Sequence, residues 1–224
     1  MSVKISKMGL SKNGDQELED YLLASSFLKT LAYFDVFQYP LYESEVYRFS
    51  ASKNIDINEG KRTLEYLLKK GIIGKKKNLF YLGKSENKIK RRLSGNDLAK
   101  KRMKQALIYS GIIASFPFVR SVCISGSLSK GYMQSDSDID YFIVTKKNRL
   151  WLSRTLLILF KKIFLLNSHK NFCLNYFIDD ESLNIKEQNI YTATEVAMLI
   201  PMYNKHLHQK FLIENSWYQE YYPN

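Results

Sequence analysis

Cysteine, histidine and proline are scarce in this 224-residue chain, which has two, three and four of them. Two cysteines give neither a disulfide framework nor a metal-type spacing, so a small disulfide-stapled secreted domain and a zinc module are excluded. Because both lie in segments that read as strands, we expect Cys123 and Cys173 to be buried free thiols. Free thiols are typical of a reducing compartment, and we expect a cytoplasmic protein.

Long hydrophobic runs are absent as well. The first twenty residues contain no apolar core of signal-peptide length, so export is not indicated. The most apolar run, residues 150–166, is interrupted by Arg154, Lys161 and Lys162 and falls short of a membrane span. We predict a helix buried on one face there, with an interfacial membrane helix as the alternative.

Acidic residues are outnumbered, 22 against 34 Lys and Arg, which gives a net charge of +12. The excess is local: residues 61–104 hold sixteen Lys or Arg and only Glu65, Glu86 and Asp97 as acids. The remainder of the chain is therefore nearly neutral. A hydrophobic fraction of 45% and a charged fraction of 25% are typical of a soluble globular protein.

The chain is organised around residues 119–145, in which two apolar β-prone runs, 119–125 and 139–145, flank a polar segment. That segment begins Gly126-Ser127 and closes on Asp138-Ile139-Asp140. Strand alternation places Asp138 and Asp140 on one face, about 7 Å apart. Two such carboxylates repel each other unless a cation lies between them, and their hard oxygens suit Mg²⁺ or Mn²⁺. Gly126 permits a sharp turn, and the Ser127 hydroxyl with nearby amides can hold a phosphate.

This spacing resembles the signature of the nucleotidyltransferase superfamily typified by DNA polymerase β: an apolar strand, Gly-Ser, a spacer and Asp-x-Asp. The resemblance implies a magnesium-dependent transfer of a nucleoside monophosphate from a nucleoside triphosphate (NTP) to an acceptor, with release of pyrophosphate. It implies catalytic and metal-binding roles for Asp138 and Asp140, and nucleotide binding by Gly126, Ser127, Lys130 and Ser137. The acceptor is a small molecule, a protein or a nucleic acid, and the sequence does not choose among them.

One departure from the family pattern concerns the third carboxylate, which the superfamily usually carries on a later strand. On the predicted strand 172–178 the aligned position is Asn175, which by alternation shares a face with Cys173 and Phe177. Asn offers a neutral oxygen but no charge; Asp179 and Asp180 at the strand end are the alternative. The second functional reading is therefore a catalytically weak or inactive protein that senses nucleotide and binds nucleic acid or a protein partner.

The N-terminal part predicts three helices and a hairpin. Helical spacing of apolar residues begins at Leu18 and ends near Asp35, a second helix starts at Pro40, and a third runs from an Asn58 cap to Gly71. The segment 72–82 reads as a hairpin around a Lys-Lys-Lys-Asn turn. This order resembles a winged helix-turn-helix.

Basic residues of the third helix and the hairpin are candidate phosphate contacts to nucleic acid: Lys61, Arg62, Lys75, Lys76 and Lys77. A solvated face or a protein-interaction module is the alternative.

Between these parts, residues 84–115 predict one long basic helix, or two if Gly95 interrupts it. Its predicted inner side includes Leu98, Met103, Leu107, Ile108 and Ile112. Towards the C-terminus, Thr192 or Thr194 caps a helix through residue 208 that Pro201 kinks or divides. We expect the aromatic residues after 216 to dock on the protein or to mark where a longer parent chain was cut.

The predicted fold is α+β, with a winged-helix-like domain followed by a small mixed β-sheet of nucleotidyltransferase type with flanking helices. The predicted domains are a disordered lead-in at 1–17, the winged-helix-like domain at 18–84, a connecting basic helix at 85–117 and the nucleotidyltransferase domain at 118–224. The last of these is C-terminally truncated if the chain is a fragment.

Overall fold

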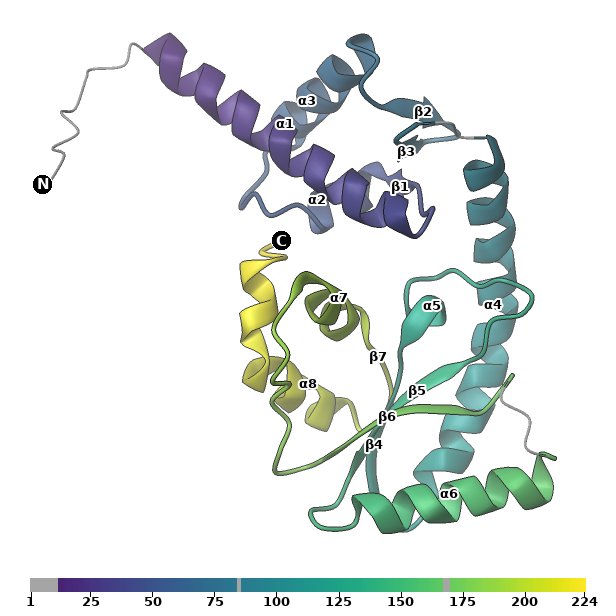
Figure 1. The fold of residues 1–224 in the computed structure, drawn as a ribbon. Coiled ribbons are helices and arrows are strands. Elements are labelled where there is room, and N and C mark those ends of the chain that lie inside the picture. Colours follow the sequence, from purple (N-terminus) through teal and green to yellow (C-terminus); the bar gives the residue numbers. More distant parts are fainter. Residues whose placement is uncertain (1–11, 84–85, 167–169) are drawn as a thin grey trace, which may run out of the picture. The chain divides into compact units, whose positions relative to one another are not determined.

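The computed structural model describes residues 12–83, 86–166 and 170–224 (Figure 1). Contacts divide the chain into two compact units: unit 1, Met1–Ile89 with Pro223–Asn224, and unit 2, Lys90–Tyr222. The fold is α+β: helices with a small antiparallel sheet in unit 1, and a mixed four-stranded sheet with helices in unit 2. The domain limits derived from the sequence stay a prediction.

Unit 1 contains the three predicted helices and the predicted hairpin. Its elements are α1 (Lys12–Val36), β1 (Leu41–Tyr42), α2 (Glu43–Arg48), α3 (Ile57–Lys69), β2 (Gly74–Lys76) and β3 (Leu79–Tyr81). The strands form an antiparallel sheet in the order β1-β3-β2. The hairpin turn consists of Lys77 and Asn78, both with positive φ, which matches the right-handed twist of the two strands.

Two helix starts in unit 1 differ from the prediction. α1 begins at Lys12, so residues 12–17 are helical rather than part of a lead-in, and residues 1–11 lie outside the described residues. α2 begins at Glu43 rather than at Pro40, because Leu41 and Tyr42 pair with β3 as an extra strand. The polar composition of 12–17 concealed the start of this helix, since a helical segment that lacks an apolar stripe gives no periodic signal.

The cap of α3 also differs from the prediction. Asp56, not Asn58, caps this helix, and its Oδ1 accepts hydrogen bonds from the amides of Asn58 at 2.9 Å and Glu59 at 3.0 Å. The predicted end is confirmed: α3 stops at Lys69, and Gly71 follows at φ +68°, the left-handed conformation that closes a helix.

Unit 2 is built on a four-stranded sheet in the order β6-β5-β4-β7. Its elements follow α4 (Glu86–Ala114), which begins in unit 1; they are β4 (Val119–Ile124), α5 (Gly126–Ser129), β5 (Asp140–Thr145), α6 (Leu150–Phe164), β6 (Cys173–Asp179), α7 (Ile190–Met198), β7 (Ile200–Tyr203), α8 (Lys205–Glu214) and a 3₁₀ turn (Ser216–Glu220). β4 pairs antiparallel with β5 and β7, whereas β6 runs parallel to β5 after the crossover helix α6.

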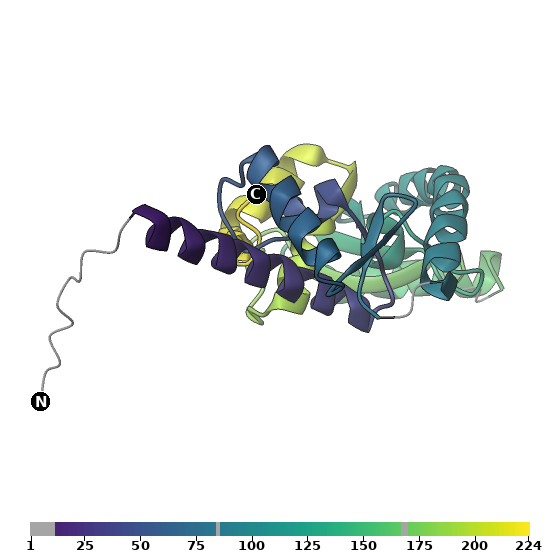
Figure 2. The ribbon, with the colours of Figure 1, turned by 90° about the horizontal axis from the view of Figure 1, so that it is seen from above.

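Helices cover both faces of this sheet. One face packs against α4 and α6 through a core that includes Ala106, Ile113, Tyr141 and Leu157. The other face packs against α7, α8 and the C-terminal aromatics, in a core that includes the buried Phe211. Figures 1 and 2 show α4 (teal) and the C-terminal elements (yellow) on opposite sides of the strands.

The long helix α4 is continuous through Gly95, which confirms the first predicted alternative, one helix, over a helix interrupted at Gly95. The predicted inner side is wrong in part: Leu107 and Ile108 are 61% and 64% exposed. The buried apolar residues that α4 contributes to this core are instead Ala99, Ala106 and Ile113, which recur every seven residues, two turns of a helix. Small alanines let α4 approach the sheet closely, and their low hydrophobicity hid this face from the sequence pattern.

The predicted helix through Pro201 is wrong. α7 is capped by Asn189 rather than by Thr192 or Thr194, and it ends at Met198. Pro201 lies in β7, paired with Cys123 of β4. A proline is tolerated there because β7 is an edge strand.

The C-terminal aromatics dock on unit 2, as predicted. Trp217 and Tyr218 pack against the core on the α8 side of the sheet. The hydroxyls of Tyr222 and Thr194 lie 2.6 Å apart, so the end of the chain also contacts α7.

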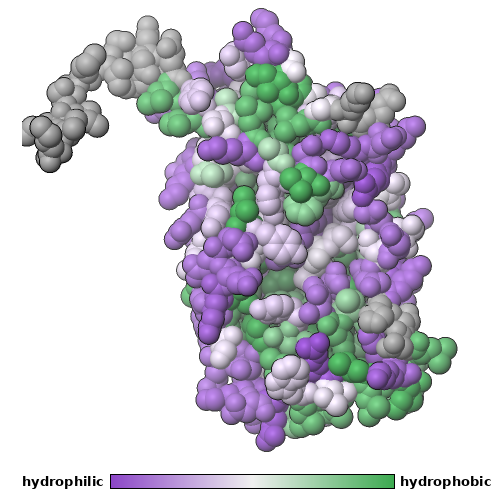
Figure 3. All heavy atoms as spheres, viewed as in Figure 1, coloured by the Kyte–Doolittle hydropathy of each residue, from purple (hydrophilic) through white to green (hydrophobic). Residues whose placement is uncertain are grey.

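α6 buries one side, as predicted. Ser153 and Leu157 are buried, and so is Lys161, whose carbon stem packs inward. Hydrophobic side chains gather over the outer side of α6 in Figure 3: Trp151, Leu152, Leu159, Ile163, Phe164 and, just beyond its end, Leu166. None of the helices in the described residues combines the length and the apolarity needed to cross a membrane.

Because Gly95 has no side chain, the loop between α5 and β5 packs closely against α4 at this position. A Cβ at this position would lie 2.3 Å from the ring of Tyr132 and 3.0 Å from the carbonyl oxygen of Met133, whose amide donates to the Gly95 carbonyl at 3.1 Å. The hydroxyl of Tyr132 also accepts from Arg91 Nε at 3.1 Å. The loop therefore lies directly on the helix backbone.

We expect Gly95→Ala to lower the free energy of unfolding by about 1–3 kcal/mol, the usual effect of overpacking, despite the better helix propensity of alanine. The matched control is Gly111→Ala in the same helix, where a Cβ meets no atom within 4 Å. This control should gain up to about 1 kcal/mol. Urea unfolding measures both, and equal stabilisation of the two variants would contradict the close contact.

Candidate active site

Gly126 stands where β4 turns into α5, at φ +65°. Its conformation is left-handed, and a Cβ would lie 2.3 Å from Oδ2 of Asp140. The two residues are brought together by the β4–β5 pairing, which continues beyond the ladder through a 2.9 Å hydrogen bond from the Ser125 amide to the Asp140 carbonyl. Glycine is thus required twice, for the turn and for the carboxylate that lies against it.

Asp140 is the first residue of β5, and Asp138 precedes it by two. Desolvation raises the pKa of Asp140, and the nearby charges of Asp138 and Glu195 raise it further. A hydrogen bond from the Cys173 thiol and the charge of Lys130 act in the opposite direction. Ionised Asp140 is therefore held in a site that disfavours its charge, an arrangement common where a cation or a proton is to be handled.

Cys173, not Asn175, stands opposite Asp140 in the parallel ladder. A register irregularity follows Leu174, so that Tyr176 pairs with Phe142 and its ring stacks on that residue. A bulge of this kind adds a residue and reverses the alternation. The prediction that Cys173 and Phe177 share a face is therefore wrong, and Asn175 is the exposed extra residue of the bulge.

The thiol of Cys173 stays protonated near neutral pH. Desolvation by burial and the neighbouring Asp140 raise its pKa to about 12. It donates to the carboxylate and adds no charge, so no strand of the described residues supplies a third carboxylate beside Asp140. Asp179 is in register with Thr145, about 16 Å along the strand from Asp140, and Asp180 accepts from the Lys147 amide at 2.8 Å.

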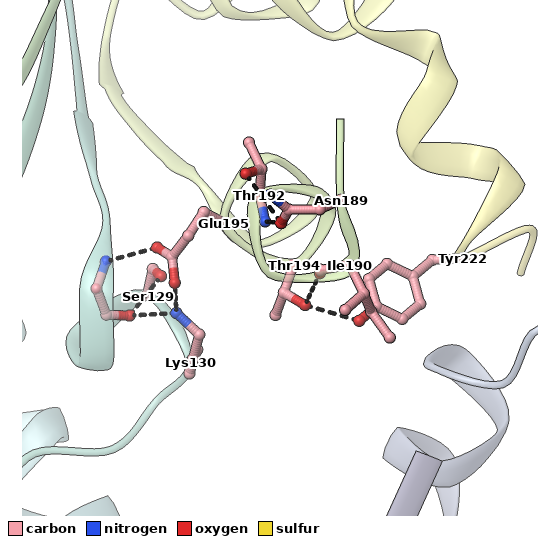
Figure 4. Close-up of polar contacts among 9 residues, drawn as sticks. Ser129, Lys130, Asn189, Ile190, Thr192, Thr194, Glu195 and Tyr222 are labelled. Carbon is pink, nitrogen blue, oxygen red and sulfur yellow. Dashed lines mark hydrogen bonds and ion pairs between the residues drawn. The ribbon is translucent and has the colours of Figure 1, made fainter. Parts of the chain in front are cut away.

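Glu195 is a carboxylate of the site that the sequence pattern does not single out. It lies on α7, where the side chain of Asn189 accepts from the Thr192 amide at 2.9 Å. Its Oε1 accepts from Lys130 Nζ at 2.6 Å, and its Oε2 accepts from the Gly126 amide at 3.3 Å (Figure 4). No spacing links Glu195 to the Gly-Ser or Asp-x-Asp segments, so only the fold reveals it.

The other predicted nucleotide-binding residues do not all lie at the Gly126 turn. Lys130 faces the turn and donates to the Gly126 carbonyl at 3.0 Å as well as to Glu195. Ser127 is half-buried in α5, beside Gly126. Ser137 is occupied in its own loop, because its Oγ accepts from the Gln134 amide at 3.2 Å. The structure thus brings Gly126, Lys130, Asp140 and Glu195 together by direct contact or charge.

The predicted nucleic-acid residues lie elsewhere, in unit 1. Lys61 and Arg62 are exposed on α3, and Lys75, Lys76 and Lys77 are exposed on the hairpin. The ammonium group of Lys75 lies 4.9 Å from the ring centre of Phe80.

β4 turns through the left-handed Gly126 into the short helix α5, and the carboxylate of Asp140 on the neighbouring strand lies against that glycine. This arrangement agrees with a comparison to protein families. Residues 111–211 match the family model of the nucleotidyltransferase domain. The chain contains a nucleotidyltransferase domain. Searches of curated proteins and of solved structures found no match. The matched residues include Gly126, both aspartates and Glu195.

Nucleotidyltransferase domains typically use a divalent metal, and the residues present fit Mg²⁺. Asp138 and Asp140 lie close enough for the charge of one to raise the pKa of the other, a repulsion that a cation removes. Mg²⁺ is usually held by one or two carboxylates, with water and phosphate oxygens as its other ligands. Among the described residues no three His, Cys, Asp or Glu side chains already form a metal cluster. A two-carboxylate site completed by substrate fits this donor set.

Two glycine variants distinguish the energetic effect of the Gly126–Asp140 contact from that of a positive φ. Gly131 has φ +66°, and a Cβ there would meet no atom within 4 Å, so Gly131→Ala should cost only about 1–2 kcal/mol of unfolding free energy. Gly126→Ala carries the same strain and also forces Asp140 away. We expect it to cost at least about 1 kcal/mol more, the lower end of an overpacking penalty, measured by urea unfolding. Equal losses in the two variants would contradict the contact.

Proposed function

We propose that the protein is a magnesium-dependent nucleotidyltransferase that transfers a nucleoside monophosphate from an NTP to an acceptor and releases pyrophosphate. The observation that carries the proposal is the contact of the Gly126 turn with Asp140. A phosphate held at that turn would lie beside the carboxylates that hold its metal ion. This juxtaposition is what transfer of an α-phosphoryl group requires.

Each residue of the site has a role in this proposal. Asp138 and Asp140 hold Mg²⁺ or Mn²⁺, Gly126 and Ser127 donate hydrogen bonds to the β- and γ-phosphates, and Lys130 neutralises phosphate charge. The metal ion, when bound, withdraws charge from the phosphate oxygens. A nucleophilic oxygen of the acceptor attacks the α-phosphorus, and the bond to the bridging oxygen of pyrophosphate breaks. Small molecules, protein side chains and nucleic-acid ends all carry such an oxygen.

Isothermal titration with each NTP and Mg²⁺ tests this proposal. We expect one NTP to bind, and the variant Asp138→Asn/Asp140→Asn to weaken binding at least about tenfold, because charged contacts of this kind contribute roughly 1.5–3 kcal/mol. Asp136→Asn removes an exposed carboxylate of the same loop and is the matched control. Incubation of α-labelled NTP with cell extract then identifies the acceptor. Metal-independent binding that the double variant leaves unchanged would overturn the proposal.

A second candidate follows from Cys173, which leaves the described strands without a third carboxylate beside Asp140. In that reading the domain binds nucleotide with little or no turnover, and unit 1 binds nucleic acid through Lys61, Arg62 and the hairpin lysines. All five side chains are exposed, as phosphate contacts require. A protein-binding role for unit 1 is the remaining form of this candidate.

Salt dependence of binding to duplex DNA tests the second candidate. Each phosphate contact contributes roughly 0.9 to the slope of log K against log salt, so the variant Lys75→Ala/Lys76→Ala/Lys77→Ala should reduce the slope by about 2–3. A variant that removes three exposed lysines of unit 2, at positions 186, 205 and 210, matches its change in net charge. Equal effects of the two variants would show that only total charge matters and would count against the hairpin.

A further inference from the structure

The proposed phosphate-binding turn already holds an anion. The carboxylate of Glu195 accepts from the Lys130 ammonium at 2.6 Å and from the Gly126 amide at 3.3 Å (Figure 4). An ammonium and a backbone amide at a turn are the two donors that a nucleotide phosphate would use there. Glu195 therefore occupies the donors that the substrate needs.

The Glu195–Lys130 pair is well defined and shielded from solvent. The two side chains are 25% and 18% exposed. Lys130 also donates to the Gly126 carbonyl at 3.0 Å, so a second contact directs its ammonium at the turn. α7, which carries Glu195, is held from behind by the 2.6 Å contact between Thr194 and Tyr222.

Glu195 adds a further negative charge to a site that already holds two aspartates. Its charge contributes to the raised pKa values of Asp140 and of Tyr191, one turn earlier on α7. A residue whose only task is to tie α7 to the turn does not need to be an acid beside two aspartates. A neutral side chain would make the amide contact without that repulsion.

We propose that Glu195 is a specificity-determining residue that competes with the nucleotide for the Gly126–Lys130 donors and has to leave them before an NTP binds. A triphosphate accompanied by Mg²⁺ displaces it because the triphosphate is held both through the metal at the aspartates and by the donors of the turn, whereas a monophosphate or inorganic phosphate makes fewer of these contacts and displaces it poorly. Glu195 thereby sets the affinity and favours triphosphates. This inference rests on the proposed function, since it assumes that phosphate binds at this turn.

The test compares Glu195→Gln with the wild type in titrations of each NTP, and of inorganic tripolyphosphate, with Mg²⁺. Gln keeps the size of the side chain and an acceptor for the amide but removes the charge that pairs with Lys130. We expect about tenfold tighter binding of NTP and tripolyphosphate, and detectable binding of the nucleoside monophosphate, because a competing charged contact is removed. Glu195→Ala is the second variant: it also removes the charge, and it cannot make a new contact through a Gln amide. Glu187→Gln, an exposed acid shortly before α7, is the control and should bind as the wild type does.

Other outcomes separate this inference from the proposed function. If the wild type binds an NTP through Asp138 and Asp140 and both Glu195 variants bind equally or more weakly, the competitor role is overturned and the proposed function stands. Weaker binding would make Glu195 a ligand of the metal or substrate instead. If neither the wild type nor a folded Glu195 variant, verified by thermal melting, binds any NTP or tripolyphosphate, both proposals fall. Binding only by the variants would support the competitor role of Glu195 and would contradict the expectation that the wild-type protein binds an NTP.

Discussion

The structure of unit 2 depends on one close approach, the backbone of Gly126 against the carboxylate of Asp140. Antiparallel pairing of β4 and β5 brings the end of one strand to the start of the other, and the left-handed conformation of Gly126 turns the chain before a side chain can intervene. A backbone amide and a carboxylate thus share one small space. Any substrate that bridges them is positioned by rigid strand ends rather than by mobile loops.

That approach is supported by packing at some distance from the site. The loop between α5 and β5 is fixed on α4 by Met133, which is 1% exposed and donates its amide to the Gly95 carbonyl. Because Lys130 and Asp138 lie on either side of the fixed residue, the helix glycine constrains both functional ends of the loop. On the other face of the sheet, the aromatic C-terminus holds α7 and with it Glu195. Residues packed on both faces of the sheet therefore support the polar groups around Gly126.

Much of this arrangement can be predicted from the sequence, because local signals and global fold agree there. Strand, Gly-Ser, loop and Asp-x-Asp follow in the predicted order, and turn chemistry alone predicts Gly71 and the hairpin turn. The prediction fails where long-range pairing overrides local pattern. Pro201 resembles a helix kink in the sequence, but its segment pairs with β4 as an edge strand. The bulge at Asn175 shifts every face assignment after it, since a strand has a period of two residues.

Glu195 shows most clearly what sequence pattern cannot supply. It lies on a helix far beyond Asp140 in the chain, where the sequence predicts a threonine cap instead of Asn189, and its neighbours carry no motif. Only its hydrogen bonds with Gly126 and Lys130 identify it as part of the candidate site.

The charges of the site connect Glu195 to the neutral Cys173. Asp140 and the two carboxylates that raise its pKa, those of Asp138 and Glu195, share one nearby ammonium, that of Lys130, so together these groups carry excess negative charge. In the proposed function Mg²⁺ would offset that excess, and the triphosphate that follows would add negative charge again. Expelling one carboxylate as the phosphate arrives, as proposed for Glu195, would remove part of the added negative charge. A neutral Cys173 beside Asp140 would serve the same end in the proposed function, because a fourth fixed acid would make nucleotide binding electrostatically harder.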